Sequence, residues 1–341
     1  YILWGMTYTI MDIPYWSMIP ALTSSKEERE QVAVIPRIFA STAWLIMGTF
    51  GLSIVKKLGN GNVVKGYSSF AVVIAVAFII SAIITCLNVK ERVETPKNAE
   101  KVSFKQTLNI IRKNDQLVVF IGIVLGMNLI MQISGSMAIY YFTYVVGKES
   151  LFSVYQAFAG IAEISGLVLL PILTKKIGRE DVFKFGSILP IAGFLLLFVA
   201  GIVAPQNALF IGMAGAILKL GSGFLLGSTT IMLADVVDYG EFKLGTRNES
   251  IVFSVQTLLV KGASAVAGWL VGVGLSLVGY VAGEVQSATT ILGMRVIMIW
   301  IPIVCAIVMY TIYKSKYKIN GKFHDDMLVE LEKRKKANDA I

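Results

Sequence analysis

Nine apolar runs divide this chain of 341 residues, and each is long enough to cross the hydrocarbon core of a membrane. They lie near residues 1–21, 34–55, 66–88, 116–146, 151–173, 183–203, 207–234, 250–279 and 291–313. Hydrophobic residues make up 55% of the chain and charged residues only 16%, unlike the balance in soluble domains. Because a segment in lipid must satisfy its backbone hydrogen bonds internally, the pattern predicts an all-α membrane protein with nine transmembrane helices.

The basic residues between the runs predict the orientation of the chain. If the loop after the first run faces the cytoplasm, the alternate loops and the tail hold 24 of the 31 lysines and arginines. The opposite loops hold only Lys56, Lys57, Lys65 and Lys148. Cytoplasmic loops are enriched in lysine and arginine, so the C-terminus is expected inside. This asymmetry accounts for the net charge of +9, which therefore does not indicate a nucleic-acid partner.

A polar connector at residues 89–115 separates three runs from six. Within it, Phe104, Leu108 and Ile111 fall on one helical face among lysines. Such a helix can lie on the inner membrane surface or serve as a solvated linker. The tail beyond residue 314 is expected to form a short surface helix near residues 325–336.

Three spans, a basic connector and six spans suggest a transporter of twelve spans. Such transporters consist of two six-helix halves around a site near the membrane midplane. We therefore expect the last three helices of the N-terminal half in residues 1–88, a complete C-terminal half in 116–314, and a cytoplasmic tail in 315–341. The first three helices are expected to lie outside this chain.

An acid within the first run is the leading candidate for a binding residue. Tyr8, Asp12 and Trp16 are spaced four residues apart, which places them on one face of a helix. Acids at membrane depth usually face a cavity or the bundle interior. A carboxylate can accept hydrogen bonds from neighbouring hydroxyls, and an indole can cover a pyranose ring, so the group suits a sugar. The alternative is an acid that only helps helices to pack.

A lysine deep in the eighth run is the second candidate. Lys261 lies about eleven residues into its span, too deep for its ammonium to reach the interface easily. Thr257 lies one turn before it on the same face. The lysine either serves a site or forms a salt bridge between the two halves. Arg37, at the start of the second run, could bind sugar hydroxyls or act as a cytoplasmic anchor.

Charged residues of both signs crowd the segment that follows the seventh run. Asp235 and Asp238 are three residues apart and share a helical face, and Arg247 follows them. Ion pairs at the end of a span can close the inner mouth of a carrier and break when it opens. Solvated surface pairs, worth under ~1 kcal/mol, are the other interpretation.

Two opposite charges lie near the middle of two different runs. Glu163 and Lys219 are at the same depth, in the second and fourth spans of the C-terminal half. We predict that they compensate each other, within ~4 Å or through one water. The pair either docks two helices or titrates and takes part in proton coupling.

Metal and disulfide chemistry find little support. Cys86 and Cys305 both lie inside apolar runs without metal-ligand spacing, and His324 is the single histidine. We expect no cofactor and no metal site.

The chain resembles the glycoside–pentoside–hexuronide:cation symporters, over nearly its whole length. The passages that carry the resemblance are residues 1–17, Ala234-Asp-Val-Val-Asp-Tyr-Gly-Glu241, residues 249–262 and Lys318-Ile-Asn-Gly321. The resemblance implies a major-facilitator fold, alternating access and a multi-pass protein of the bacterial inner membrane. It also implies a sugar substrate and Na+, Li+ or H+ as the coupling ion.

The resemblance further implies roles for individual residues. Asp12 would recognise the sugar, Trp16 would stack on its ring, and Tyr8 and Arg37 would be co-ligands. Gln256 and Thr257 would line the sugar cavity from the other half. Thr9 and Lys261 would lie at the cation site.

One position departs from the family pattern, because Leu226 stands where a cavity tryptophan is expected. This departure argues against melibiose as the preferred sugar, and the sequence does not identify which sugar is preferred. A carrier of the same fold for a lipid or drug-like solute is the alternative function, but it would not need a hydroxyl-binding acid between aromatic residues.

Overall fold

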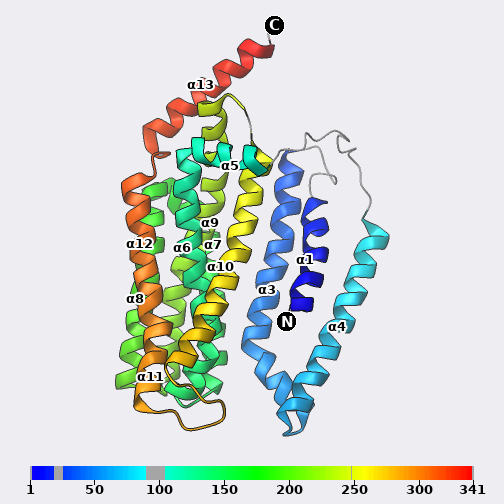
Figure 1. The fold of residues 1–341 in the computed structure, drawn as a ribbon, viewed down its shortest axis with the longest axis vertical. Helices are drawn as coiled ribbons and strands as arrows, with labels where there is room; N and C mark the ends of the chain where they lie inside the picture. The colour runs from blue at the N-terminus through cyan, green and yellow to red at the C-terminus, as the bar shows by residue number, and fades with distance from the viewer. Residues whose placement is uncertain (1, 19–25, 90–103, 247, 340–341) are drawn as a thin grey trace. The chain divides into compact units, whose positions relative to one another are not determined.

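The computed structural model describes residues 2–18, 26–89, 104–246 and 248–339, and every regular element in them is a helix. The all-α class is therefore confirmed. In chain order the helices are α1 Ile2–Ser17, α3 Lys26–Gly59, α4 Val63–Asn88, α5 Phe104–Lys113, α6 Asp115–Tyr140, the π-helix η1 Tyr141–Val145, α7 Ser150–Ile177, α8 Arg179–Val203, α9 Ala208–Leu244, α10 Glu249–Leu277, α11 Ala288–Arg295, the π-helix η2 Val296–Trp300, α12 Ile301–Lys316 and α13 Gly321–Asp339 (Figure 1).

Seven helical segments of the described residues are long and apolar enough to cross a membrane. They are α4, α6 with η1, α7, α8, α9, α10, and the continuous run from α11 through η2 to α12. Each coincides with one of the apolar runs of the sequence. The first two runs lie on α1 and α3, which are not among the seven. The protein is thus a multi-pass membrane protein, and the count of nine spans stays a prediction.

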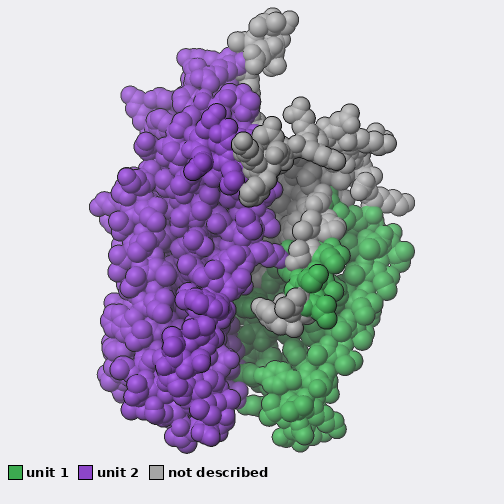
Figure 2. All heavy atoms as spheres, viewed as in Figure 1, with its two compact units in different colours: residues 1–101 green, residues 102–341 purple. Residues whose placement is uncertain are grey.

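The chain divides into two compact units, residues 1–101 and residues 102–341 (Figure 2). We describe each by itself. Unit 1 holds α1, α3 and α4, and unit 2 holds α5 to α13. Most of the connector predicted at residues 89–115 lies outside the described residues, because these resume at Phe104.

In unit 1, a tight turn joins α3 to α4. Gly61 adopts a positive φ of 91°, which glycine tolerates without steric cost. The side chain of Asn62 then caps α4 by accepting a hydrogen bond from the Lys65 amide at 3.0 Å. Gly66 lets the two helices approach closely, because a Cβ there would overlap the carbonyl oxygen of Val55.

Unit 2 is organised around two helices, α9 and α6. Helix α9 packs along α7 and α8, while α6 packs along α10 and α12. Large side chains fill the space between these groups, and Phe120, Tyr141, Phe183 and Phe194 are fully buried. Exposed apolar residues on the outer faces of the same helices suit contact with lipid.

The tail helix α13 docks on one end of unit 2, the end that also carries α5 (Figure 1). Met327 and Leu331 are buried, and the ring of Phe323 packs against that of Phe242 on α9. Arg334 donates a hydrogen bond to the carbonyl oxygen of Phe242 at 3.0 Å. The expected surface helix at residues 325–336 is therefore longer than predicted, and its apolar side is held by the protein.

Candidate functional site

One face of α1 carries the acid that the sequence marks as a binding residue. The backbone is helical from Ile2 to Ser17, so Tyr8, Asp12 and Trp16 are placed along a single face. The Tyr8 side chain is 42% exposed, and Asp12 is half-buried. The side chains of Thr9, Trp16 and Arg37 lie outside the described part of the structure. The face thus presents a carboxylate and a phenol at neighbouring turns, which suits hydrogen bonding to a polyol.

The second predicted group lies on α10 in unit 2. Gln256 is half-buried, Thr257 is exposed, and Lys261 is half-buried one turn further along. The Thr257 hydroxyl donates to the carbonyl oxygen of Phe253 at 3.1 Å, as threonines in helices commonly do. Because α1 belongs to the other unit, a shared role for the two groups stays a prediction.

The charges predicted to compensate each other do meet. Lys219 Nζ on α9 lies 2.7 Å from Glu163 Oε2 on α7, and the pairing is confirmed. The lysine and glutamate side chains are 18% and 20% exposed. This is a mostly buried ion pair near the middle of two spans, and its role stays a prediction.

Asp235 lies within helix α9, although the apolar run of the sequence ends at residue 234. Helix α9 continues to Leu244 because Val236, Val237 and Gly240 remain buried against neighbouring elements. Asp235 itself is 6% exposed. Its carboxylate accepts from Arg179 at 3.3 Å, and the His324 Nε2 lies 3.2 Å from its other oxygen. Arg179 belongs to α8 and His324 to α13, so these two partners of Asp235 come from its own unit.

The structure says less about the other two residues that were predicted to close the inner mouth, Asp238 and Arg247. Asp238 is half-buried one turn after Asp235, on the same side of α9. Arg247 lies outside the described residues. Opening and closing of an inner mouth by these charges stays a prediction.

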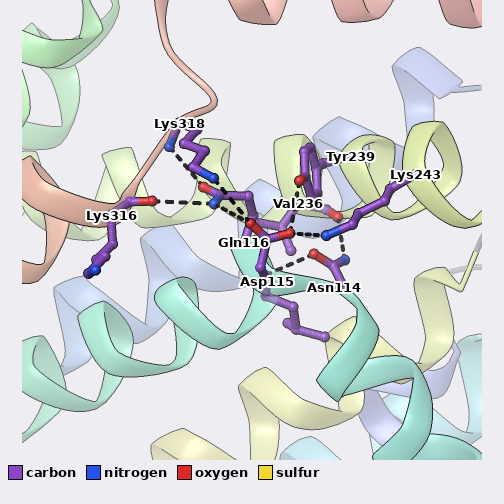
Figure 3. A network of polar contacts seen from close by, with 9 residues as sticks. Asn114, Asp115, Gln116, Val236, Tyr239, Lys243, Lys316 and Lys318 are labelled. Atoms are coloured by element: carbon purple, nitrogen blue, oxygen red, sulfur yellow. Dashed lines mark hydrogen bonds and ion pairs between the residues drawn. The ribbon is translucent and has the colours of Figure 1, made fainter.

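A second polar cluster joins α6, α9 and the segment after α12 (Figure 3). Asp115 accepts hydrogen bonds from the Tyr239 hydroxyl at 2.8 Å and from the Lys243 ammonium, and Lys318 Nζ lies 3.7 Å away. Gln116 binds the backbone on both sides of the α12 end: its amide donates to the Lys316 carbonyl oxygen and accepts from the Lys318 amide. The cluster fixes the start of α6 to the ends of α9 and α12.

The start of α6 is also capped from within the cluster. Asn114 is 1% exposed, and its side-chain oxygen accepts from the Leu117 amide at 2.9 Å. Its amide nitrogen donates to the carbonyl oxygen of Val236 at 3.3 Å. One asparagine therefore satisfies an unpaired donor of its own helix and contacts α9 as well.

A small cavity borders Asp235 between α7, α8, α9 and the segment after α12. Arg179, Ser228, Tyr317 and Asn320 contribute polar groups to its walls. Burial, together with the nearby Asp235 carboxylate, raises the pKa of Tyr317, which therefore stays a neutral phenol. The cavity belongs to unit 2 alone, and it is separate from the candidate residues on α10.

Sequence reasoning missed several partners in these clusters. Arg179 and Lys243 are among the basic residues that the sequence assigns to cytoplasmic loops, and for His324 the sequence predicts no partner. A polar triplet before an apolar run, as at residues 114–116, is a recognisable signal for a helix start. The pairing of His324 with Asp235 has no such signal, because it depends on where α13 docks.

Comparison with known proteins agrees with this helical architecture. The family of MFS/sugar transport proteins matches the chain from residue 1 to residue 321. Together with the candidate membrane spans, this match defines a membrane carrier of the major facilitator type.

The chain belongs to this sugar transport family, among the glycoside–pentoside–hexuronide:cation symporters.

Relatives across several bacteria carry sugar names. The isoprimeverose transporter of Lactiplantibacillus pentosus is 31% identical over 98% of this chain and 69% of its own length. A putative sulfoquinovose importer of Salmonella typhimurium is 30% identical over 100% of this chain and 71% of its own. The raffinose carrier protein of Pediococcus pentosaceus is 27% identical over 98% of this chain and 53% of its own.

Proposed function

We propose that this protein carries a glycoside or oligosaccharide across the bacterial inner membrane together with a cation, by alternating access. The observation that carries the proposal is Asp12, an acid on an apolar helix, with Tyr8 one turn before it on the same face. Membership of the sugar transport family and the names of the relatives support the substrate class.

The proposed site uses groups with complementary tasks. The Asp12 carboxylate accepts hydrogen bonds from sugar hydroxyls, and the Tyr8 phenol can both donate and accept. Trp16 covers the apolar face of the ring, and Arg37 donates to hydroxyls. Gln256 and Thr257 contribute amide and hydroxyl groups from α10.

The coupling ion is proposed to be Na+, Li+ or H+, with Thr9 and Lys261 close to its site. A lysine near a cation site responds to the bound coupling ion, because the positive charge of that ion repels the lysine ammonium. The excess of lysine and arginine in alternate loops supports a cytoplasmic C-terminus. The end of unit 2 that carries α5 and α13 would then face the cytoplasm.

Counterflow of labelled sugars in vesicles tests the proposal. The whole protein is reconstituted, loaded with one unlabelled sugar at a time, and given the same sugar in labelled form outside. The panel contains isoprimeverose, raffinose, lactose and melibiose, with a lipid-like solute as the alternative substrate. We expect transient accumulation of at least one sugar; accumulation of the lipid-like solute alone would overturn the proposal.

Replacement of Asp12 by Asn tests the recognition residue. The change keeps the shape but weakens the charge-assisted bonds to hydroxyls, so sugar affinity should fall at least tenfold, about 1.4 kcal/mol. The matched control is Glu284→Gln, the same chemical change on an exposed loop residue, which should leave affinity unchanged. Equal affinities of the Asp12→Asn variant and the unmodified protein would remove Asp12 from the site.

A further inference from the structure

One arginine of unit 2 lies inside a membrane span and has no acidic partner in the described part of the chain. Arg295 is the last residue of α11, within the run from Ala288 to Lys316 that is long and apolar enough to cross a membrane. Its Nη2 donates to the carbonyl oxygen of Gly201 on α8 at 3.2 Å, while its buried Nε has no hydrogen-bond partner. Ionisable residues at such positions are costly, so they usually serve a function.

The contact with Gly201 balances only part of this charge. Helix α8 ends at Val203, and the carbonyl groups of its last turn have no partner within the helix. An arginine that donates to such a carbonyl also offsets the negative end of the helix dipole, which amounts to about half an elementary charge. The guanidinium carries a full positive charge and is not deprotonated in proteins. About half of its charge is therefore left for another partner.

The guanidinium lies near the end of unit 2 that is opposite α13. Figure 1 shows α11 at this end. Side chains tilt toward the start of their helix, so Arg295 extends back toward the start of α11. Its contact with Gly201, in the last turn of α8, agrees with this direction. The charge thus reaches toward the level where the helices leave the apolar layer, which is where lipid headgroups lie.

Apolar side chains surround this position on the outer face of unit 2. Leu292 and Val296 lie within one turn of Arg295 and are exposed, as is Ile202 at the end of α8. Exposed apolar groups in a membrane span suit contact with lipid. A partner that reaches Arg295 from this face therefore meets hydrocarbon-binding groups as well as the charge.

The apolar face continues deeper along the same two elements. Trp300, in the π-helix η2, is 42% exposed and packs edge-on against Phe198 of α8, with ring centroids 5.6 Å apart. Hydrogen bonds in a π-helix join residues five apart, so Trp300 lies about one turn beyond Arg295. The seam between α8 and η2 thus combines a positive group near its end with an apolar and aromatic wall further in.

We propose that Arg295 binds the phosphate of an anionic phospholipid whose acyl chains follow the seam between α8 and η2. The guanidinium hydrogens that Gly201 does not use donate to the phosphate oxygens. Basic groups between membrane helices are suited to lipid headgroups. A lipid fits better than a dissolved anion, because only a lipid also covers the apolar wall. With the C-terminus in the cytoplasm, this lipid belongs to the outer leaflet.

Quenching by brominated lipids measures binding at this seam. In the whole protein, every tryptophan except Trp300 is replaced by Phe. The protein is reconstituted in phosphatidylcholine with increasing fractions of phosphatidylglycerol or phosphatidylcholine that carries bromine on its acyl chains. The two quenching curves give the relative binding constant of the two lipids beside Trp300. We expect phosphatidylglycerol to be favoured about fivefold, equivalent to ~1 kcal/mol.

A second protein reports on lipid elsewhere on unit 2. It lacks Trp300 as well and carries Ile161→Trp, at an exposed position of α7. Ile161 follows the start of α7 by eleven residues, and Trp300 follows the start of α11 by twelve. We expect no preference for phosphatidylglycerol at this position. An equal preference at both positions would overturn the proposal, because it would reflect a general property of the bilayer around the protein.

Replacement of Arg295 separates its charge from its role as a helix cap. Arg295→Gln keeps an amide that can donate to Gly201 but removes the charge, so the preference at Trp300 should disappear. Lys148→Gln is the matched control, since it removes a charge from an exposed residue three positions after η1, which packs against α11. The control should keep the preference. Full preference in the Arg295→Gln protein would contradict the proposal.

Inorganic phosphate distinguishes a lipid from a dissolved anion. Added to the protein with Arg295 intact at constant ionic strength, it should leave the preference at Trp300 unchanged; loss of the preference would assign the site to a free anion. Equal binding of the two lipids at Trp300 with Arg295 intact would also overturn the proposal. That measurement needs no replacement of Arg295, so it decides the matter even if Arg295→Gln does not fold. None of these readouts depends on the sugar.

Discussion

Unit 2 holds its charges in two contrasting arrangements. Near the middle of α7 and α9, Glu163 and Lys219 form an ion pair at 2.7 Å, and glycines of α9 lie one turn before and one turn after Lys219. At the end that carries α13, Asp235 and Asp115 each contact two or more groups from different elements. In the Glu163–Lys219 pair each charge therefore depends on one partner, whereas in the clusters each acid has several partners.

The difference lies in what remains when one member is removed. In the pair, the surviving charge is left mostly buried without its partner, and little water can replace it. In the clusters, the surviving side chains keep other partners or turn toward solvent: the Arg179 and Lys243 side chains are 48% and 40% exposed. Removal of one charge should therefore lower the free energy of unfolding more in the pair than in the clusters.

The largest effect is expected when one member of the pair is replaced. Glu163→Met or Lys219→Met alone should reduce the free energy of unfolding by ~3–5 kcal/mol, because an uncompensated charge stays buried. Replacement of both should cost much less than the sum of the single changes. Unfolding of the detergent-solubilised protein by urea measures all three; additive losses would show that the two charges do not compensate each other.

An intermediate effect is expected at Asp235. Asp235→Asn keeps the shape but removes the carboxylate that contacts Arg179 and His324, and we expect a loss of about 1–3 kcal/mol. Asp325→Asn is the matched control, since its side chain is 79% exposed and also lies near His324. A loss at Asp235 as large as that at Glu163 would contradict the distinction between the two arrangements.

The smallest effect is expected at Lys243. Lys243→Met should cost under ~1 kcal/mol, because Asp115 keeps the Tyr239 hydroxyl and Lys318 as partners. The same urea titration measures it, with the exposed Lys314→Met as control. A loss above ~3 kcal/mol would show that this cluster depends on one contact as strongly as the pair does.

The fold was largely predictable because the membrane leaves few solutions. Apolar runs near the required length form helices there, and seven of the nine coincide with helical segments of the described residues that are long and apolar enough to cross a membrane. The boundaries were less predictable where a helix leaves the apolar layer. Helix α9 extends ten residues beyond the predicted end at 234, since its apolar side packs on α13 and its polar side can be solvated.

Some contacts of the candidate sites could also be predicted from the sequence, and others could not. The Glu163–Lys219 pair was predictable because two opposite charges in apolar runs have few alternatives to each other. The contacts of Asp235 with His324, and of Asp115 with Lys243, were not, because polar loops offer many possible partners. Only the docking of α13 and the packing of α9 on α6 select among them.

Sugar-driven cation movement tests the proposed symport most directly. The whole protein is reconstituted without an ion gradient, a substrate sugar from the counterflow panel is added outside, and Na+, Li+ and H+ are followed separately. We predict that sugar entry carries at least one of these cations inward. Sugar entry without movement of any of the three cations would contradict the account.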